Sequence, residues 1–256
     1  MIRRSSMMLL VSLALCIAAG APASASIKSE AVVYKQGDTE LHGYLVYDAD
    51  KQGKRPGVLV VHEWWGLNDH SRDSAEELAR QGYVALAVDM YGEGKSTEHP
   101  QQAGEWATWI RSNKEVGAAR FQAGYDLLAA HELTNEDQIA AIGYCFGGSV
   151  VLTMAMNGAD LKGVVSFHGG LPTEPVPVDE INAKILVCHG GADGSMSHEQ
   201  VQTFLGNLDA VEADYQFIIY SGAQHGFTRR SPAYDADADR RSWDAMWTFF
   251  GELFEE

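Results

Sequence analysis

The sequence is poor in cysteine and in positive charge. Its 256 residues include three cysteines, too few for the disulfide framework of a small secreted protein. Nineteen lysines and arginines stand against 35 acidic residues, which gives a formal net charge of -16. Nucleic acids and anionic membrane surfaces are bound through a basic face. The charge balance therefore argues against either of them as a partner.

Long apolar runs are scarce as well. One lies near the N-terminus, from Met7 to Ala19, after two arginines, and it is too short to span a bilayer comfortably. Ala23-Ser24-Ala25 then matches the small-residue pattern at which signal peptides are cleaved. We expect residues 1–25 to be a signal peptide cleaved before Ser26, and the mature protein to be periplasmic or secreted. An uncleaved membrane anchor is the alternative.

Beyond this segment, short apolar runs alternate with segments of helical character, which is typical of an α/β protein with a doubly wound, mostly parallel sheet and flanking helices. The first two runs, joined by a turn at Gly37-Asp38, predict an antiparallel hairpin at a sheet edge. We expect one domain over residues 26–256. Its expected strands are 31–34, 41–47, 58–61, 83–88, 138–142, 163–167, 183–188 and 215–220, and its expected helices are 68–81, 101–130 with a break near 112–116, 149–156, 197–208 and 236–254.

A glycine-rich pentapeptide, Gly143-Tyr144-Cys145-Phe146-Gly147, separates an expected strand from an expected helix. In α/β-hydrolases the pattern G-x-S-x-G at such a junction forms a sharp, strained turn that exposes the nucleophile. Glycines on either side relieve the crowding of that turn. Here cysteine holds the central position, so Cys145 is a candidate nucleophile. A tight turn with a buried cysteine is the simpler alternative.

Two further loops supply the partners that such a nucleophile needs. Asp193 lies in a glycine-rich loop just after the strand that ends at Cys188, and His225 lies in another after the last strand. The order Cys145, Asp193, His225 is the nucleophile–acid–base order of α/β-hydrolases. Because ligands of such sheets bind beyond the carboxyl ends of the strands, the three side chains should meet there.

These residue types suggest a mechanism. His225 would take the thiol proton of Cys145, Asp193 would orient the imidazole, and the thiolate would attack an acyl carbonyl to form a thioester. The oxyanion needs two backbone donors. One should be the N–H of Phe146, and the other should come from the loop after the strand 58–61.

With the loop His62-Glu63-Trp64-Trp65-Gly66-Leu67-Asn68 added, the chain resembles the dienelactone hydrolase family. The other matching segments are 89–91, 143–148, 191–193 and 225–227. The resemblance implies an α/β-hydrolase fold and hydrolysis of a lactone or small carboxylic ester without a cofactor.

The resemblance also implies roles for single residues. A glutamate matching Glu63 contacts the resting thiol and helps to activate it when substrate binds, and the N–H at Trp64 matches the second oxyanion donor. Members that act on dienelactone hold its carboxylate with two arginines, one of which matches Arg229. Where the other should fall, this chain has Glu93, with Lys95 nearby but out of register. We therefore expect dienelactone itself to be a doubtful substrate.

Trp65 and Tyr144 complete the candidate substrate-binding residues. The two indoles of Trp64 and Trp65, beside a nucleophile, suit an apolar pocket, and packing in the core is the alternative for them. We expect no metal, because the histidines that follow strands, His62, His168 and His189, lack a metal-binding spacing. We also expect a monomer. A thiol carboxylesterase or thioesterase without dienelactone activity, or a non-catalytic binding protein on a hydrolase scaffold, would be the alternative.

Overall fold

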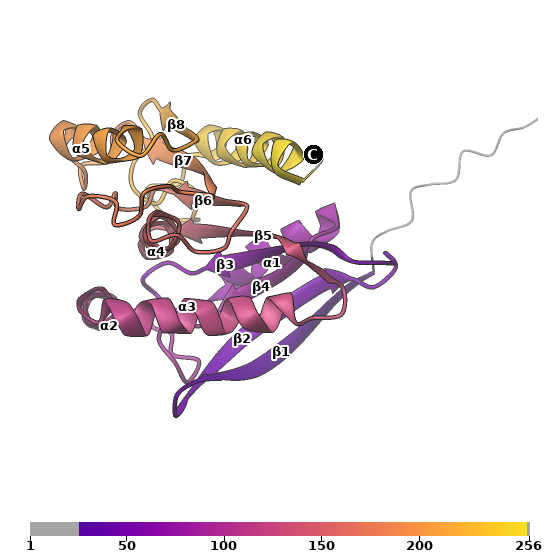
Figure 1. The fold of residues 1–256 in the computed structure, drawn as a ribbon. Coiled ribbons are helices and arrows are strands. Elements are labelled where there is room, and N and C mark those ends of the chain that lie inside the picture. The colour runs from indigo at the N-terminus through magenta and orange to yellow at the C-terminus, as the bar shows by residue number, and fades with distance from the viewer. Residues whose placement is uncertain (1–25, 255–256) are drawn as a thin grey trace, which may run out of the picture.

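The computed structural model describes residues 26–254 and contains a twisted eight-stranded sheet flanked by helices (Figure 1). The strand order is β1-β2-β4-β3-β5-β6-β7-β8. The first two strands pair with each other and β2 pairs with β4 in antiparallel fashion, whereas every other pairing is parallel. The α/β-hydrolase fold expected from the sequence is confirmed, including the antiparallel N-terminal hairpin at the sheet edge.

The elements follow the expected alternation. The strands are β1 Ile27–Gln36, β2 Thr39–Asp48, β3 Arg55–Val61, β4 Val84–Val88, β5 Thr134–Tyr144, β6 Gly163–Phe167, β7 Lys184–Gly190 and β8 Tyr215–Tyr220. The helices are α1 Asp69–Gln81, α2 Pro100–Ser112, α3 Lys114–Ala129, α4 Phe146–Met156, α5 His198–Asp209 and α6 Ala236–Phe254.

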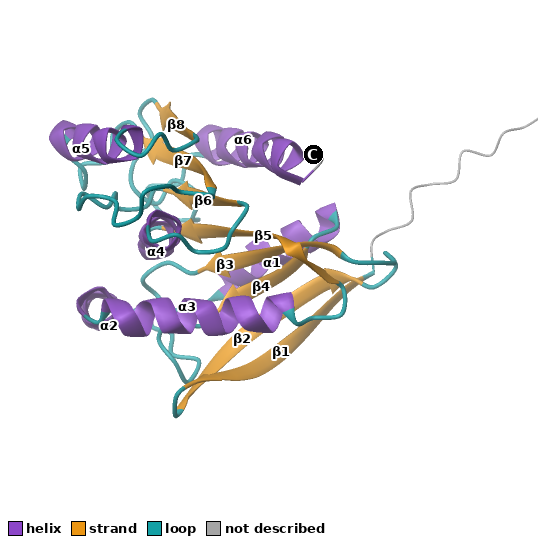
Figure 2. Ribbon diagram, viewed as in Figure 1, coloured by secondary structure: helices purple, strands orange, loops and turns teal. Residues whose placement is uncertain are grey.

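Helices cover both faces of the sheet (Figure 2). Alternate residues of a strand point to opposite faces, so Leu59 and Val61 of β3 join one buried cluster and Val58 and Val60 join the other. The first cluster takes in α2, α3, α4 and α5, and the second takes in α1 and α6. Strands buried on both faces explain the continuous apolar runs of the sequence.

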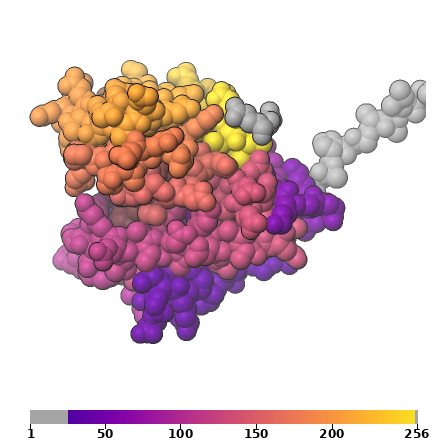
Figure 3. All heavy atoms as spheres, viewed as in Figure 1, coloured from indigo at the N-terminus to yellow at the C-terminus, as the bar shows by residue number. Residues whose placement is uncertain are grey.

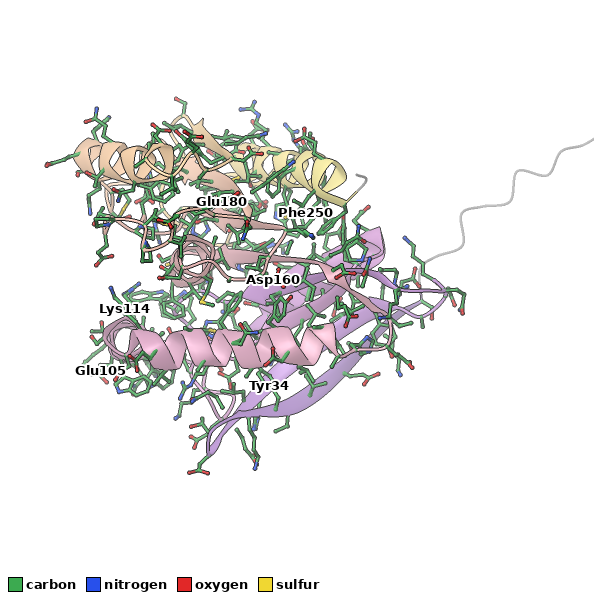
Figure 4. All side chains as sticks on the ribbon, in the orientation of Figure 1. Tyr34, Glu105, Lys114, Asp160, Glu180 and Phe250 are labelled. Carbon is green, nitrogen blue, oxygen red and sulfur yellow. The ribbon has the colours of Figure 1, made fainter. Side chains whose placement is uncertain are left out.

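The hairpin and the last strand form opposite edges of the sheet. In the space-filling view the turn of the N-terminal hairpin accordingly lies at the bottom of the molecule and the C-terminal elements lie at the top (Figure 3). Figure 4 labels Tyr34, which lies beneath α3, and Phe250, which packs from α6 onto the other face.

Helix boundaries agree with local chemistry. Gly82 ends α1 in the left-handed conformation, and a capping box between Ser197 and Gln200 opens α5. Asn113 separates α2 from α3 at the expected break. The largest difference is at α4, which begins at Phe146, three residues before the expected start at Ser149. The two glycines that follow Phe146 belong to the first turn of α4.

The predicted signal peptide, residues 1–25, lies outside the described residues. Within residues 26–254, no helix is both long and apolar enough to cross a membrane.

Candidate active site

Cys145 lies at the junction of β5 and α4, in a strained backbone conformation with φ 53° and ψ -111°. A side chain at Gly143 would collide with the backbone of Gly147, and a side chain at Gly147 would collide with the carbonyl of Val61. The backbone N–H of Cys145 donates to the carbonyl of Phe167 in β6 (3.0 Å). The pentapeptide therefore forms the sharp turn expected from the sequence, and its glycines are required by close packing.

His225 lies between Cys145 and Asp193. Its Nε2 is 3.1 Å from Cys145 Sγ, and its Nδ1 is 2.8 Å from Asp193 Oδ2. The loops that carry the acid and the histidine are joined directly, because the N–H of Ala192 donates to the carbonyl of Ala223 (2.9 Å). Three residues distant in the chain thus meet beyond the carboxyl ends of β5, β7 and β8, as the sequence predicted.

His225 and Asp193 shift each other's pKa in the direction that favours a charged pair. Hydrogen bonds to Asp193 and to Cys145 raise the pKa of His225 to about 10, against a smaller opposing effect of burial. Burial by itself would raise the pKa of Asp193, but hydrogen bonds from His225 and Ser195 outweigh it and hold that pKa below its ordinary value. The N–H and hydroxyl of Ser195 donate to Asp193 Oδ1 at 2.9 and 2.6 Å. The arrangement favours a carboxylate that orients an imidazolium.

The two expected oxyanion donors have no protein acceptor in the described part of the chain: neither Trp64 N–H nor Phe146 N–H makes a hydrogen bond there. The hydroxyl of Tyr91 donates to the carbonyl of Trp64 (2.9 Å) and so fixes that peptide. His62 supports the same loop, since its Nδ1 bonds to the carbonyl of Glu63 and its Nε2 accepts from the N–H of Met90 (3.2 Å).

Glu63 is almost fully buried, but its partners differ from those implied by the resemblance. Its Oε2 is 3.5 Å from Arg229 Nε and 3.6 Å from His70 Nδ1. Among the described residues, the hydrogen bond of the Cys145 thiol goes to His225, and none joins it to Glu63. The role that the resemblance implies for Glu63 at the thiol therefore stays a prediction. Burial raises the pKa of Glu63 to about 7, although the charges of Arg229 and His225 oppose the rise.

A cavity of about 340 Å³ opens onto the nucleophile, and its lining comprises Glu63, Trp64, Trp65, Cys145, His225, Gly226, Arg229 and Ser231. The two indoles meet edge to face, with ring centroids 4.9 Å apart. The guanidinium of Arg229 lies over the Trp65 ring at 5.1 Å, a cation–π contact. The pocket is thus apolar on one side, and its lining includes two cationic groups, the Arg229 guanidinium and the His225 imidazolium.

Tyr144 does not belong to the pocket, contrary to expectation. Its ring is fully buried, stacks on Phe167 at 4.9 Å, and its hydroxyl accepts a hydrogen bond from Ser74 (3.1 Å). As the last residue of β5, it points to the face covered by α1 and α6. A residue with no exposed surface cannot contact substrate, so Tyr144 is a core residue.

Glu93 and Lys95 do not line the cavity. They form an ion pair with each other at 2.9 Å, and their side chains are 66% and 42% exposed. The carboxylate that stands where an arginine was expected is therefore neutralised at the surface.

Several residues near the nucleophile were missed by sequence reasoning. Ser195 and Ser231 are small polar loop residues with no spacing that sets them apart. His70 lies in the first turn of α1 beside the ring of Tyr144, with centroids 4.6 Å apart. No sequence signal connects it with Glu63. Within residues 26–254, no group of three or more His, Cys, Asp or Glu side chains is arranged so that it could hold a metal ion.

Comparisons with known proteins identify the family of the chain. The model of the dienelactone hydrolase family matches residues 41–254. A Yersinia pestis protein provisionally named a carboxymethylenebutenolidase is 29% identical over 239 residues, 86% of each chain. A dienelactone hydrolase-like promiscuous phosphotriesterase from metagenomic libraries has a solved structure with a TM-score of 0.85 and 35% identity, covering 89% of this chain and 99% of that one.

A solved structure from Klebsiella pneumoniae, provisionally assigned as a dienelactone hydrolase, shares the fold with a TM-score of 0.79 at 23% identity, covering 88% of this chain and 99% of that one. The resemblance seen in the sequence is confirmed by the family model and by the relatives. The chain belongs to the dienelactone hydrolase family and is a hydrolase that acts on ester bonds.

Proposed function

We propose that this protein cleaves lactones or small carboxylic esters through a thioester on Cys145. The observation that carries the proposal is the continuous chain of contacts from Cys145 Sγ through both nitrogens of His225 to Asp193, at 3.1 and 2.8 Å. A thiol in such a chain can pass its proton to the imidazole and become a nucleophilic thiolate.

The reaction then has two halves. The Cys145 thiolate attacks the acyl carbonyl, and the N–H groups of Phe146 and Trp64 stabilise the oxyanion. Collapse of the tetrahedral intermediate breaks the C–O bond while the His225 imidazolium protonates the leaving oxygen. Water, deprotonated by His225, next attacks the thioester carbonyl, and the C–S bond breaks to release the acid and regenerate the thiol.

The pocket favours a small acyl group carrying at most one negative charge. Besides His225, Arg229 is the cation of the described lining, and Glu63 partly neutralises it at 3.5 Å. The pairing of Glu93 with Lys95 leaves no second cation from that loop in the lining. This observation favours the alternative function, a thiol carboxylesterase without dienelactone activity, over a dedicated dienelactone hydrolase.

The test is turnover of a substrate panel by wild type, Cys145→Ala and Cys188→Ala. The panel contains dienelactone, a neutral lactone, short-chain aryl esters with and without a carboxylate, and a dialkyl aryl phosphate, the last because of the phosphotriesterase relative. Cys188 is the matched control, since burial raises its pKa to about 12. Cys145→Ala should abolish hydrolysis and Cys188→Ala should preserve it.

Mass spectrometry of acid-quenched wild type should find the acyl group on the peptide that contains Cys145. An undiminished rate in Cys145→Ala would refute the proposal. Turnover of aryl esters without turnover of dienelactone would select the carboxylesterase alternative.

We also propose that the protein is exported and acts as a monomer after loss of residues 1–25. Support for export comes from the sequence alone, namely the basic start, the short apolar run and Ala23-Ser24-Ala25.

A further inference from the structure

His168 directly follows β6 and has no part in the chemistry proposed above. It is fully buried, yet its φ is 42°, in a region that residues other than glycine adopt at a cost. A strained conformation of this kind persists only where the surroundings hold it. The contacts of His168 therefore indicate which structural role maintains this strained conformation.

The backbone around His168 joins the strands that carry the nucleophile and the acid. Its N–H donates to the carbonyl of Cys188 in β7 (2.8 Å), two strands from β5. The carbonyl of the preceding residue, Phe167, accepts the N–H of Cys145 (3.0 Å). The same dipeptide thus fixes the nucleophile relative to the strand that leads to Asp193.

The side chain of His168 extends this connection to the third catalytic loop. Its Nε2 is 2.8 Å from the hydroxyl of Thr228, three residues after His225. Its ring also packs edge-on against the ring of His225, with centroids 5.3 Å apart and planes inclined by 65°. That loop needs an anchor, because Gly222 and Gly226 both have positive φ and the His225 side chain is 39% exposed.

The hydrogen bond explains why a histidine is present. Nδ1 of His168 is buried without a hydrogen-bond partner among the described residues, a cost that the apolar ring of phenylalanine would avoid. Burial, together with the charges of His225 and His70, keeps the pKa of His168 well below its usual value, against the attraction of Asp193. The ring is consequently neutral and adds no second positive charge beside the His225 imidazolium.

We propose that His168 and Thr228 form a positioning pair that holds the imidazole of His225 in register with Cys145 and Asp193. Neither residue lines the cavity, so neither is a catalytic residue. The inference rests on the proposed function only in taking His225 as the base of Cys145.

The first experiment compares Thr228→Val, which removes the hydroxyl, with Thr228→Ser, which keeps it. Thr203→Val is the matched control, since its hydroxyl donates to a backbone carbonyl on the exposed face of α5. The main readout is the rate of Cys145 alkylation by iodoacetamide as a function of pH, measured by mass spectrometry. The second readout is kcat and KM for the best ester of the panel.

A displaced imidazole stabilises the thiolate less well. Thr228→Val should slow alkylation at pH 6 about tenfold and move its profile to higher pH, with kcat reduced about tenfold and KM changed less than about twofold. Thr228→Ser should restore most of the rate, and Thr203→Val should match wild type. A wild-type profile in Thr228→Val, or equal damage in Thr228→Ser, would overturn the proposal.

The second experiment is a double-mutant cycle with His168→Phe. If the two side chains act as a pair, His168→Phe and Thr228→Val should have similar effects and the double variant should be no worse than His168→Phe. If the loss of activity in the double variant equals the product of the losses in the two single variants, the pairing is contradicted. If His168→Phe does not fold, as judged by circular dichroism, the three threonine variants decide the matter by themselves.

The two proposals can fail separately. If wild type hydrolyses none of the esters, the proposed function is wrong, whereas the alkylation profiles of the Thr228 variants still test the positioning pair. A change in hydrolysis without any change in the alkylation profile would place the effect elsewhere than at the cysteine–histidine contact, and would count against the pair.

Discussion

Replacing Glu63 with glutamine should stabilise the protein at alkaline pH much more than at acidic pH. The carboxyl is 4% exposed, and burial raises its pKa from 4.5 to about 7 in the folded protein. Between these two values the folded state binds more protons than the unfolded state, so the wild type loses stability as pH rises. The contribution of Glu63 is fully present below pH 4.5 and is lost as pH rises through about 7.

The size of the effect follows from the shift. Two to three pKa units correspond to about 3 kcal/mol of unfolding free energy over the whole range, of which about 2 kcal/mol falls between pH 5 and pH 8. Glutamine has almost the same shape and no charge, so Glu63→Gln does not carry this pH-dependent loss. For a chain of this length, the difference in Tm between variant and wild type should grow by roughly 4–8 °C from pH 5 to pH 8.

The assay is thermal and urea unfolding of wild type, Glu63→Gln and Glu98→Gln at pH 5, 6, 7 and 8. Glu98 is exposed and serves as the control for removing one negative charge from an acidic protein. The reasoning is refuted if the gap in unfolding free energy between Glu63→Gln and wild type is the same at pH 5 and pH 8. It is also refuted if Glu98→Gln shows an equal trend.

Three further predictions concern the triad, the core and the N-terminus. Asp193→Asn should lower kcat about 10³–10⁴-fold, because the imidazole loses its orienting carboxylate, and steady-state kinetics would contradict this with a loss below tenfold. Tyr144→Phe should leave kcat and KM within about twofold of wild type and lower the free energy of unfolding in urea by about 1 kcal/mol, since only the buried hydrogen bond with Ser74 is removed. A large rise in KM would instead show that Tyr144 contacts the substrate. Intact mass of protein recovered from the periplasm or medium should start at Ser26, and retention of residues 1–25 would argue against a cleaved signal peptide.

Local chemistry made much of this architecture readable from the sequence. Strands buried on both faces must be continuously apolar, which located β3, β4, β6 and β7. A nucleophile on a sharp turn needs small neighbours, which singled out Cys145, and chain order then selected Asp193 and His225. Strand ends were less readable, because they depend on pairing partners. Thr134 and Asn135 join β5 by pairing with Arg55 and Pro56, ahead of a register shift before Gly57.

What only the tertiary structure decided was which side chains face one another. Tyr144 and Cys145 are adjacent in sequence, but the strand places the first in the core and the positive φ of the second turns it toward His225. Glu63 lies 3.5 Å from Arg229 and 3.6 Å from His70, because the first turn of α1 and the loop after β8 converge on it. The sequence by itself determined the chemistry available, namely a thiol, a carboxylate and an imidazole, each just after a strand. Packing determined their partners, since contacts between residues far apart in the chain depend on the register and twist of the whole sheet.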